Sequence, residues 1–210
     1  MNRKKVEKIF DLLAESIEAP VSELKYENNF QLLVAVILSA QATDISVNKA
    51  TSELFKLYKT PDDFINLGEE NLKKYIKSIG LYNNKAKNII KTSKMLKSDF
   101  NSIVPDNLKD LMKLPGAGRK TANVILNVAF NKPTMAVDTH VFRTSNRIGL
   151  VNAKNVLETE KQLLKIIPDK YGVDAHHYLI LHGRYVCKAK KPQCNNCIIS
   201  KLCEKNIDVK

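Results

Sequence analysis

Apolar residues recur at helical spacing along nearly the whole chain. Near the N-terminus, Val6, Ile9, Leu13 and Ile17 mark an amphipathic helix that should end before Pro20. No segment alternates apolar and polar residues as a half-buried strand would, and no repeat of fixed period is visible. The sequence therefore predicts an all-α fold of roughly ten helices.

Capping residues and glycines predict several helix boundaries. Thr43 or Asp44 is expected to cap one helix through its side-chain oxygen. A helix over residues 69–79 should end on Gly80 in the left-handed conformation, with Leu81 just beyond.

The chain is long enough to bury one sizeable core or two small ones, with 210 residues and 44% hydrophobic content. Pro133 is the best candidate for a crossover between two helical lobes. Because the N-terminal helix would be a poor domain alone, we expect it to pack with the C-terminal lobe.

The charge balance favours a polyanionic partner. Lys and Arg number 34 against 22 Asp and Glu, which leaves a formal net charge of +12. Such an excess attracts nucleic acid, and binding should weaken steeply with salt. The alternative is a basic protein that is merely soluble.

We expect a cytoplasmic protein that is neither secreted nor inserted in a membrane. Residues 1–5 lead into an amphipathic pattern and not into the apolar stretch of a secretory signal. The longest apolar run, residues 32–38, is far too short to span a bilayer. In the cytoplasm, four cysteines serve more often as metal ligands than as disulfides.

A Gly-x-Gly turn lies between two apolar helical segments. Gly116 and Gly118 allow positive φ angles and a close approach of the backbone to a ligand. The helix that begins near Arg119 adds unpaired N–H groups and the positive end of its dipole, which favour an anion. On so basic a chain the fitting anion is a nucleic-acid phosphate, bound without regard to base sequence.

Lys120 lies near the start of this apolar helix. Beside Arg119 and the positive end of the dipole, and partly desolvated, its amine should lose a proton more easily than a free lysine does. A neutral amine can attack an aldehyde-like carbon and form a Schiff base. The simpler alternative is a lysine that contacts a phosphate.

Asp138 follows in the segment Val-Asp-Thr-His. A lone aspartate before a helix most often caps it. A carboxylate at this place can also stabilise positive charge on a sugar as a base departs, or relay a proton for Lys120. His140 is more often a structural histidine than a catalyst.

Cys187, Cys194, Cys197 and Cys203 have the spacing C-x6-C-x2-C-x5-C. Four thiolates in a short segment with few apolar residues can hold it together by binding a metal centre. The spacing alone leaves an iron–sulfur cluster and zinc open, and disulfides are the weaker alternative.

Three lysines lie inside the first cysteine loop: Lys188, Lys190 and Lys191. If the loop is rigid, they present a basic knob to a phosphate backbone. The alternative is three solvated lysines on an ordinary surface.

Taken in order, these motifs resemble those of the endonuclease III family, the bifunctional DNA glycosylase/AP lyases of the helix-hairpin-helix superfamily. The resemblance covers almost the whole chain. The matching segments are residues 38–44, 79–86, 114–122, 137–140 and 181–185, and the cysteine spacing matches the family's [4Fe–4S] loop. Ala117 stands where many relatives carry valine, a change that we expect to matter little.

The resemblance implies two helical lobes that bind double-stranded DNA containing damaged bases or abasic sites. One is a six-helix barrel with the hairpin, over residues 21–132. The other is a discontinuous iron–sulfur domain made of residues 1–20 and 133–210. We expect a monomer.

The resemblance also implies residue roles. Lys120 matches the Schiff-base nucleophile and Asp138 the catalytic aspartate. The four cysteines match the ligands of one [4Fe–4S] cluster, with zinc as the less favoured alternative. Gln41 and Leu81 match residues that fill the gap left by an extruded nucleotide, although they can be read as a helix-end polar residue and a glycine-cap partner. The full set of expected DNA contacts is Gln41, Leu81, Gly116, Gly118, Arg119, His140, Lys188, Lys190 and Lys191.

The implied reaction removes an oxidised pyrimidine from DNA and then cuts the strand. The base is flipped out of the stack, the Lys120 amine attacks C1′, and β-elimination breaks the strand 3′ to the abasic site. One alternative, a monofunctional adenine-mismatch glycosylase, is disfavoured because that branch lacks the lysine. A second alternative is a non-catalytic, metal-stabilised DNA-binding module.

Overall fold

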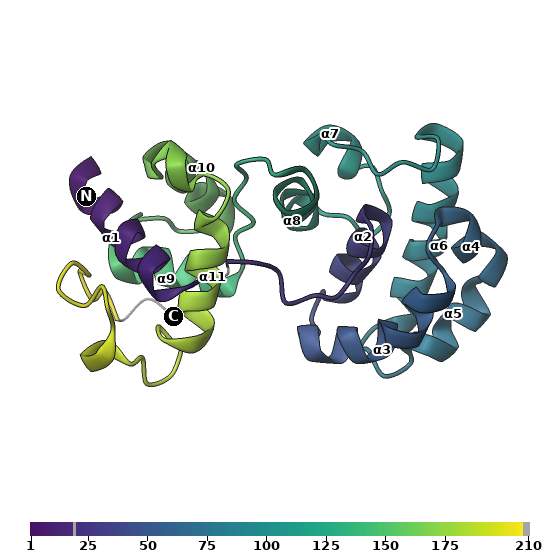
Figure 1. Cartoon of the computed structure of the whole chain (residues 1–210), viewed down its shortest axis with the longest axis horizontal. Helices are drawn as coiled ribbons and strands as arrows, with labels where there is room; N and C mark the ends of the chain where they lie inside the picture. The colour runs from purple at the N-terminus through teal and green to yellow at the C-terminus, as the bar shows by residue number, and fades with distance from the viewer. Residues whose placement is uncertain (19, 208–210) are drawn as a thin grey trace. The chain divides into compact units, whose positions relative to one another are not determined.

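Helices make up most of the chain in the computed structural model, which describes residues 1–18 and 20–207. Within these ranges there are eleven α-helices, two short 3₁₀ segments and no strand (Figure 1). The predicted all-α class is confirmed. Among the described residues, no helix is both long enough and apolar enough to cross a membrane.

The chain divides into two compact units, Ser22–Phe130 and Met1–Val21 with Asn131–Lys210. Seven helices belong to the first unit: α2 (Asn29–Leu38), α3 (Asp44–Leu57), α4 (Pro61–Leu67), α5 (Glu69–Ile76), α6 (Tyr82–Asp99), α7 (Leu108–Leu111) and α8 (Arg119–Phe130). The second unit contains α1 (Arg3–Ser16), α9 (Thr139–Ile148), α10 (Val156–Ile166) and α11 (Ala175–Tyr185), with 3₁₀ segments at Asp169–Tyr171 and Cys194–Asn196.

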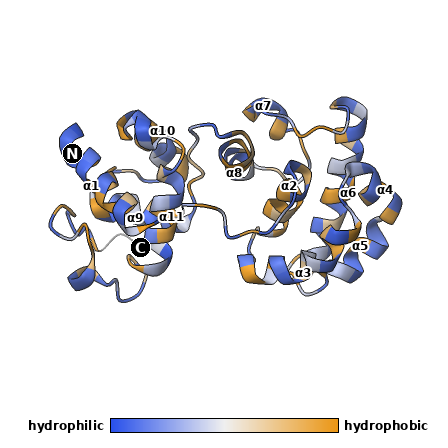
Figure 2. Cartoon of the chain, viewed as in Figure 1, coloured by the Kyte–Doolittle hydropathy of each residue, from blue (hydrophilic) through white to orange (hydrophobic). Residues whose placement is uncertain are grey.

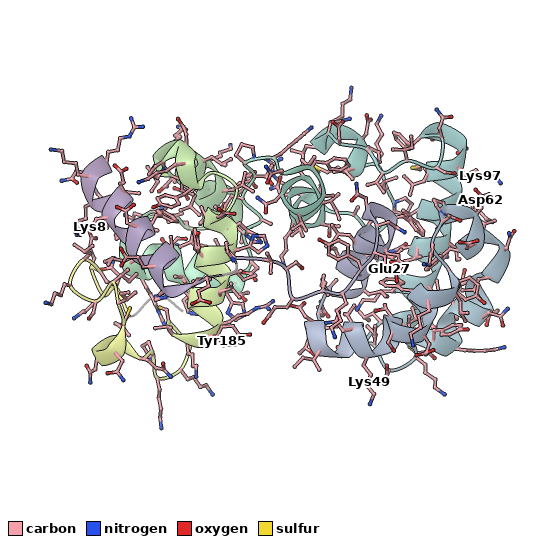
Figure 3. The ribbon with its side chains drawn as sticks, in the orientation of Figure 1. Lys8, Glu27, Lys49, Asp62, Lys97 and Tyr185 are labelled. Carbon is pink, nitrogen blue, oxygen red and sulfur yellow. The ribbon has the colours of Figure 1, made fainter. Side chains whose placement is uncertain are left out.

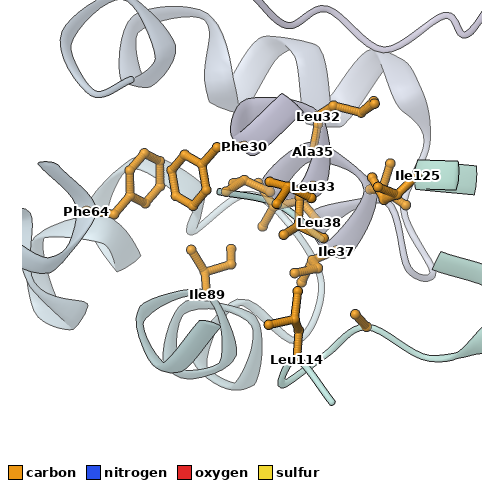
Figure 4. Packing of buried hydrophobic residues seen from close by; sticks show 14 of the residues in the cluster. Phe30, Leu32, Leu33, Ala35, Ile37, Leu38, Phe64, Ile89, Leu114 and Ile125 are labelled. Carbon is orange, nitrogen blue, oxygen red and sulfur yellow. The ribbon is translucent and has the colours of Figure 1, made fainter. Parts of the chain in front are cut away.

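Helix α2 is the centre of the first unit. Every residue of α2 after Asn29 is buried and all of these but Gln31 are apolar, and the helix packs against α3, α6 and α8 (Figure 2). Phe30 packs edge-on against Phe64 with ring centroids 5.1 Å apart, and Ile89 and Leu114 belong to the same core (Figure 4).

The second unit has its own core. Phe10 and Leu13 of α1 are buried with Val141 of α9 and Leu179 of α11. Helix α11 packs against both α1 and α9. The N-terminal helix therefore packs with the C-terminal part of the chain.

Side-chain caps begin several helices, and the cap predicted at Thr43 is confirmed. Thr43 caps α3, because its hydroxyl accepts a hydrogen bond from the Ser46 N–H at 3.2 Å. Thr60 and Asp63 form a reciprocal capping box at the start of α4. Lys97 of α6 forms an ion pair with Asp62 on the exposed side of α4 (Figure 3).

The expected glycine cap at the end of α5 is wrong. The helix ends at Ile76, and the residue in the left-handed conformation is Leu81, with φ of 60°, while Gly80 has no positive φ. The Ile79 N–H donates to the Ile76 carbonyl at 2.9 Å, so a further turn follows the helix before the chain reverses at Leu81.

Candidate functional site

The hairpin between α7 and α8 turns tightly at Gly116. Gly116 has φ of +84°, and a Cβ there would lie 3.2 Å from the Asn88 Cβ and 3.3 Å from the Ile37 Cγ2. Gly116 is therefore required both by its backbone conformation and by the space available. Gly118 is exposed and open around its Cα, and the positive φ expected there is not found.

The turn is anchored to the first unit's core. The Thr92 hydroxyl of α6 donates to the Pro115 carbonyl at 2.8 Å, and the Ala117 N–H donates to the Leu114 carbonyl at 3.0 Å. Leu114 and Ala117 are buried. A backbone fixed in this way can present its N–H groups to an anion without first being ordered.

Lys120 is exposed, and the expected partial desolvation is wrong for the free chain. It is the second residue of α8, beside the exposed Arg119, and the buried face of the helix begins with Ala122. The first turn thus projects from the core, so desolvation of this amine would have to come from a bound ligand. Its position at the positive end of the α8 dipole is as expected.

Asp138 is the N-cap of α9, as the simpler reading of the sequence predicted. Its Oδ1 accepts a hydrogen bond from the Val141 N–H at 2.8 Å, and the side chain is half-buried. His140 is half-buried, with Nδ1 3.3 Å from an Arg143 guanidinium nitrogen. Asp138 belongs to the second unit and Lys120 to the first.

The four cysteines line one cavity in the second unit, together with Arg147, Ile148 and His182. All four are free thiols and half-buried. Burial raises the pKa of the Cys197 and Cys203 thiols. The His182 Nε2 lies 3.7 Å from the Cys197 Sγ, and burial lowers the pKa of His182 to about 4. In the described part of the chain, no three His, Cys, Asp or Glu residues are placed to hold a single metal ion.

Two buried arginines of α9 hold the start of the cysteine loop, which sequence reasoning missed. Arg143 donates to the carbonyls of Gly183 at 2.8 Å and Cys187 at 3.1 Å. Arg147 donates to the carbonyls of Lys188 at 2.9 Å and Ala189 at 3.3 Å. The sequence signal would have been a pair of arginines one helical turn apart on a helix with few exposed positions.

The three lysines of this loop, Lys188, Lys190 and Lys191, are exposed. The Arg147 bonds hold the backbone at Lys188 and Ala189, and the exposure of the three lysines fits both a phosphate contact and a solvated surface.

Gln41 and Leu81 are exposed residues with left-handed backbone conformations, at φ of 55° and 60°. Left-handed φ is uncommon for residues other than glycine and costs energy, so the surrounding structure must hold these two positions in place. Gln41 lies just beyond the end of α2, where a helix-end polar residue would also lie. Leu81 does not pack against a left-handed glycine, because Gly80 has no positive φ. Both residues lie in the first unit.

Residues 34–169 match the HhH-GPD superfamily of base excision DNA repair proteins. Endonuclease III of Rickettsia prowazekii (strain Madrid E) is 58% identical over 97% of this chain and 96% of its own length. This chain belongs to the endonuclease III family.

Other members of the family agree. Endonuclease III of Escherichia coli (strain K12) is 53% identical over 97% of each chain. A solved structure of a trapped endonuclease III–DNA covalent intermediate superposes with a TM-score of 0.91 and 48% identity, covering 98% of this chain and 97% of that one. The resemblance predicted from the motifs is confirmed.

Proposed function

We propose that this protein is a base-excision repair enzyme that releases oxidised pyrimidines from double-stranded DNA and then cleaves the strand 3′ to the abasic site. The observation that carries the proposal is the rigid hairpin with Lys120 at the start of α8, in a chain that matches a covalent endonuclease III–DNA intermediate along its whole length. A covalent intermediate requires a nucleophile, and the amine of Lys120 supplies one.

In this proposal the hairpin grips the sugar-phosphate chain and Lys120 attacks C1′ of the flipped nucleotide. Arg119 and the backbone around Gly116 and Gly118 bind phosphate, and the DNA covers the exposed amine and excludes water from it. The base leaves as the C1′–N bond breaks and the Lys120 nitrogen bonds to C1′. Loss of the C2′ proton then expels the 3′ phosphate by β-elimination.

Asp138 stabilises the positive charge that develops on the sugar. Its Oδ1 is engaged with the Val141 N–H, which fixes the carboxylate in orientation while the helix begins. A carboxylate oriented in advance needs no reorganisation as charge develops. His140, two residues after Asp138, is proposed to contact the DNA backbone.

We further propose that Cys187, Cys194, Cys197 and Cys203 hold a [4Fe–4S] cluster. Four thiolates around a single zinc ion at about 2.3 Å would bring the sulfurs to about 3.8 Å from one another. The four cysteines line one cavity, so their thiolates can bind one group there, and a [4Fe–4S] cluster takes one thiolate on each of its four irons. When bound, the cluster supplies structural support for the loop that carries Lys188, Lys190 and Lys191.

The two units correspond to two proposed domains. Residues 21–132 would form the barrel domain with the hairpin, and residues 1–20 and 133–210 the iron–sulfur domain. The support is that each unit has its own hydrophobic core. Gln41 and Leu81, at the tips of two exposed turns, would fill the gap left by the extruded nucleotide.

Borohydride reduction in the presence of abasic-site DNA tests the enzyme assignment. Wild-type protein should form a covalent adduct, Lys120→Ala should form none, and Lys109→Ala, which removes an exposed lysine from the other helix of the hairpin, should form it normally. Binding to DNA without any adduct in the wild type would contradict the proposal and leave the non-catalytic module.

A further inference from the structure

Lys85 is a buried lysine in the first turn of α6, with 5% of its surface exposed. Its Nζ donates to the Leu38 carbonyl at 2.9 Å and to the Ala40 carbonyl at 2.6 Å. These carbonyls lie at the C-terminal end of α2, where the helix dipole is negative and favours a cation. The side chain therefore closes the end of the central helix of the first unit.

The same residue also holds a second turn. The Lys85 backbone N–H donates to the Leu81 carbonyl at 3.1 Å, in the first hydrogen bond of α6. Through its side chain Lys85 reaches Ala40, the residue before Gln41, and through its backbone it reaches Leu81 itself. One residue thus bonds to the chain at two exposed tips that are far apart in sequence.

Stability alone is a weak reason for a lysine at this position. Burial disfavours the charged amine and lowers the pKa of Lys85. Buried charges can often be replaced by apolar side chains of similar volume without loss of stability. Strained backbone at two exposed residues, by contrast, persists only where the surroundings hold it in place, and Lys85 bonds to the carbonyl of Ala40, beside one of them, and to the carbonyl of Leu81, the other.

We propose that Lys85 is a positioning residue that couples the Gln41 and Leu81 turns, so that both tips enter the duplex as one rigid element. The inference rests on the proposed function, because it assigns Gln41 and Leu81 to the gap left by the flipped nucleotide. Without the ammonium group, the two turns would move independently, and the side chains would have to be ordered separately at the moment of base flipping.

The test is a double-mutant cycle between Gln41→Ala and Leu81→Ala, measured as the single-turnover rate of base release from a duplex carrying an oxidised thymine. In otherwise wild-type protein, the rate loss of the double variant should differ by about fivefold from the product of the two single-variant rate losses, because the two side chains act together. In the Lys85→Met background, the rate loss of the Gln41→Ala, Leu81→Ala double variant should equal the product of the two single-variant losses. Lys87→Met, an exposed neighbour on the same helix, should keep the coupling.

A structural readout separates positioning from general loss of fold. Hydrogen exchange at the Ala42 amide, which donates to the Ser39 carbonyl at 3.1 Å, should accelerate in Lys85→Met, while exchange at core amides of α2 stays slow. The adenine opposite the flipped base can be replaced by 2-aminopurine. Its fluorescence change should be slower in Lys85→Met than in wild-type protein, because the Gln41 and Leu81 side chains would enter the gap left by the flipped nucleotide more slowly.

Two results would overturn the inference. One is the absence of coupling between Gln41 and Leu81 in otherwise wild-type protein, which needs no Lys85 variant and so stands even if Lys85→Met does not fold. The other is unchanged coupling in Lys85→Met. Failure of the proposed function looks different, since wild-type protein would then form no borohydride adduct at all.

Discussion

Asp138 has an observed role in the fold and a proposed role in the chemistry. Its Oδ1 accepts the Val141 N–H and so caps α9, and this bond also fixes the carboxylate in orientation. The two roles are separable because an asparagine oxygen caps a helix about as well as an aspartate oxygen, but carries no charge. Substitution at this residue can therefore remove one role and keep the other.

Asp138→Asn should reduce single-turnover base release by roughly 10²- to 10⁴-fold, the usual range for a positioned acid–base or electrostatic group. Thermal unfolding and DNA affinity should change little, because the cap is kept. Asp138→Ala, which also loses the cap, should in addition cost about 1 kcal/mol of stability. A near wild-type rate for Asp138→Asn would leave Asp138 as a cap alone.

The protonation of His177, a buried side chain, makes the free energy of unfolding depend on pH. It lies in α11 with 8% of its surface exposed, and burial lowers its pKa below the ordinary value of 6.5, although Asp174 acts in the opposite direction. Above pH 6.5 the ring is neutral in both states. As the pH falls below 6.5, the unfolded chain binds a proton that the folded chain excludes, so stability falls.

We predict that wild-type protein loses stability between pH 6.5 and the lower pKa of folded His177, by at most about 1.4 kcal/mol per pH unit from this group. His177→Gln, which cannot titrate, should lose less over the same interval. Urea unfolding of both proteins at several pH values measures the difference. Parallel pH profiles would show that His177 takes up its proton equally in both states.

At the scale of the helix, the close packing of α9 against α11 depends on Gly183. A Cβ at this position would lie 2.7 Å from the Thr144 Oγ1 and 3.0 Å from the His140 Cβ. Because Thr144 and His140 are part of α9, an added methyl would push the two helices apart. Asp138 caps α9 and Arg143 lies within it. The contact at Gly183 therefore also helps to fix the helix that positions these two side chains.

Gly183→Ala should destabilise the protein by about 1–3 kcal/mol, the usual cost of overpacking a close helix contact. The measurement is the shift in the urea midpoint. Gly80→Ala is a matched control, because no atom lies within 4 Å of its Cβ position and its φ is not positive. An equal effect at Gly80 and Gly183 would contradict the packing argument.

Helix boundaries show which parts of the structure a sequence can predict. Thr43 was predicted as a cap because a cap depends on residues three positions apart, here Thr43 and Ser46. Gly80 was predicted wrongly because α5 ends at Ile76, a further turn follows it, and the left-handed residue is Leu81. The Lys85 side chain bonds to Leu38 and Ala40 across a long sequence separation, and no short pattern predicts those bonds. A pattern of a few neighbouring residues therefore predicts the structure of those residues, but not contacts with distant parts of the chain.

The site follows the same division. Three features of the site each depend on a short segment of sequence and could be predicted: the hairpin, the N-cap at Asp138 and the cysteine spacing. The bonds from Arg143 and Arg147 to the cysteine loop join residues more than forty positions apart, and no short pattern encodes them. The exposure of Lys120 was also missed, because its apolar neighbours predict a buried helix but not which turn lies outside the core.

For the whole molecule, the net charge of +12 sets the strength of attraction to DNA, and the placement of lysines sets where the attraction acts. Many exposed lysines are already paired with carboxylates. Lys56 pairs with Glu53 and Lys59 with Glu27, each within 2.8 Å. Lys188, Lys190 and Lys191 are instead presented together on a loop whose backbone is fixed by Arg147.

Replacing Lys188, Lys190 and Lys191 by alanine should weaken DNA binding and flatten its salt dependence. Each phosphate contact contributes about 0.9 to the slope of log K against log salt, so the slope should fall by up to about 2.7. The control replaces Lys56, Lys59 and Lys73, which are paired with carboxylates, and changes the net charge by the same amount. If the loop lysines contact phosphate, the two triple variants differ in slope although their net charges are equal. Equal slopes would mean that attraction depends on total charge alone, and that the cysteine loop presents no phosphate contact.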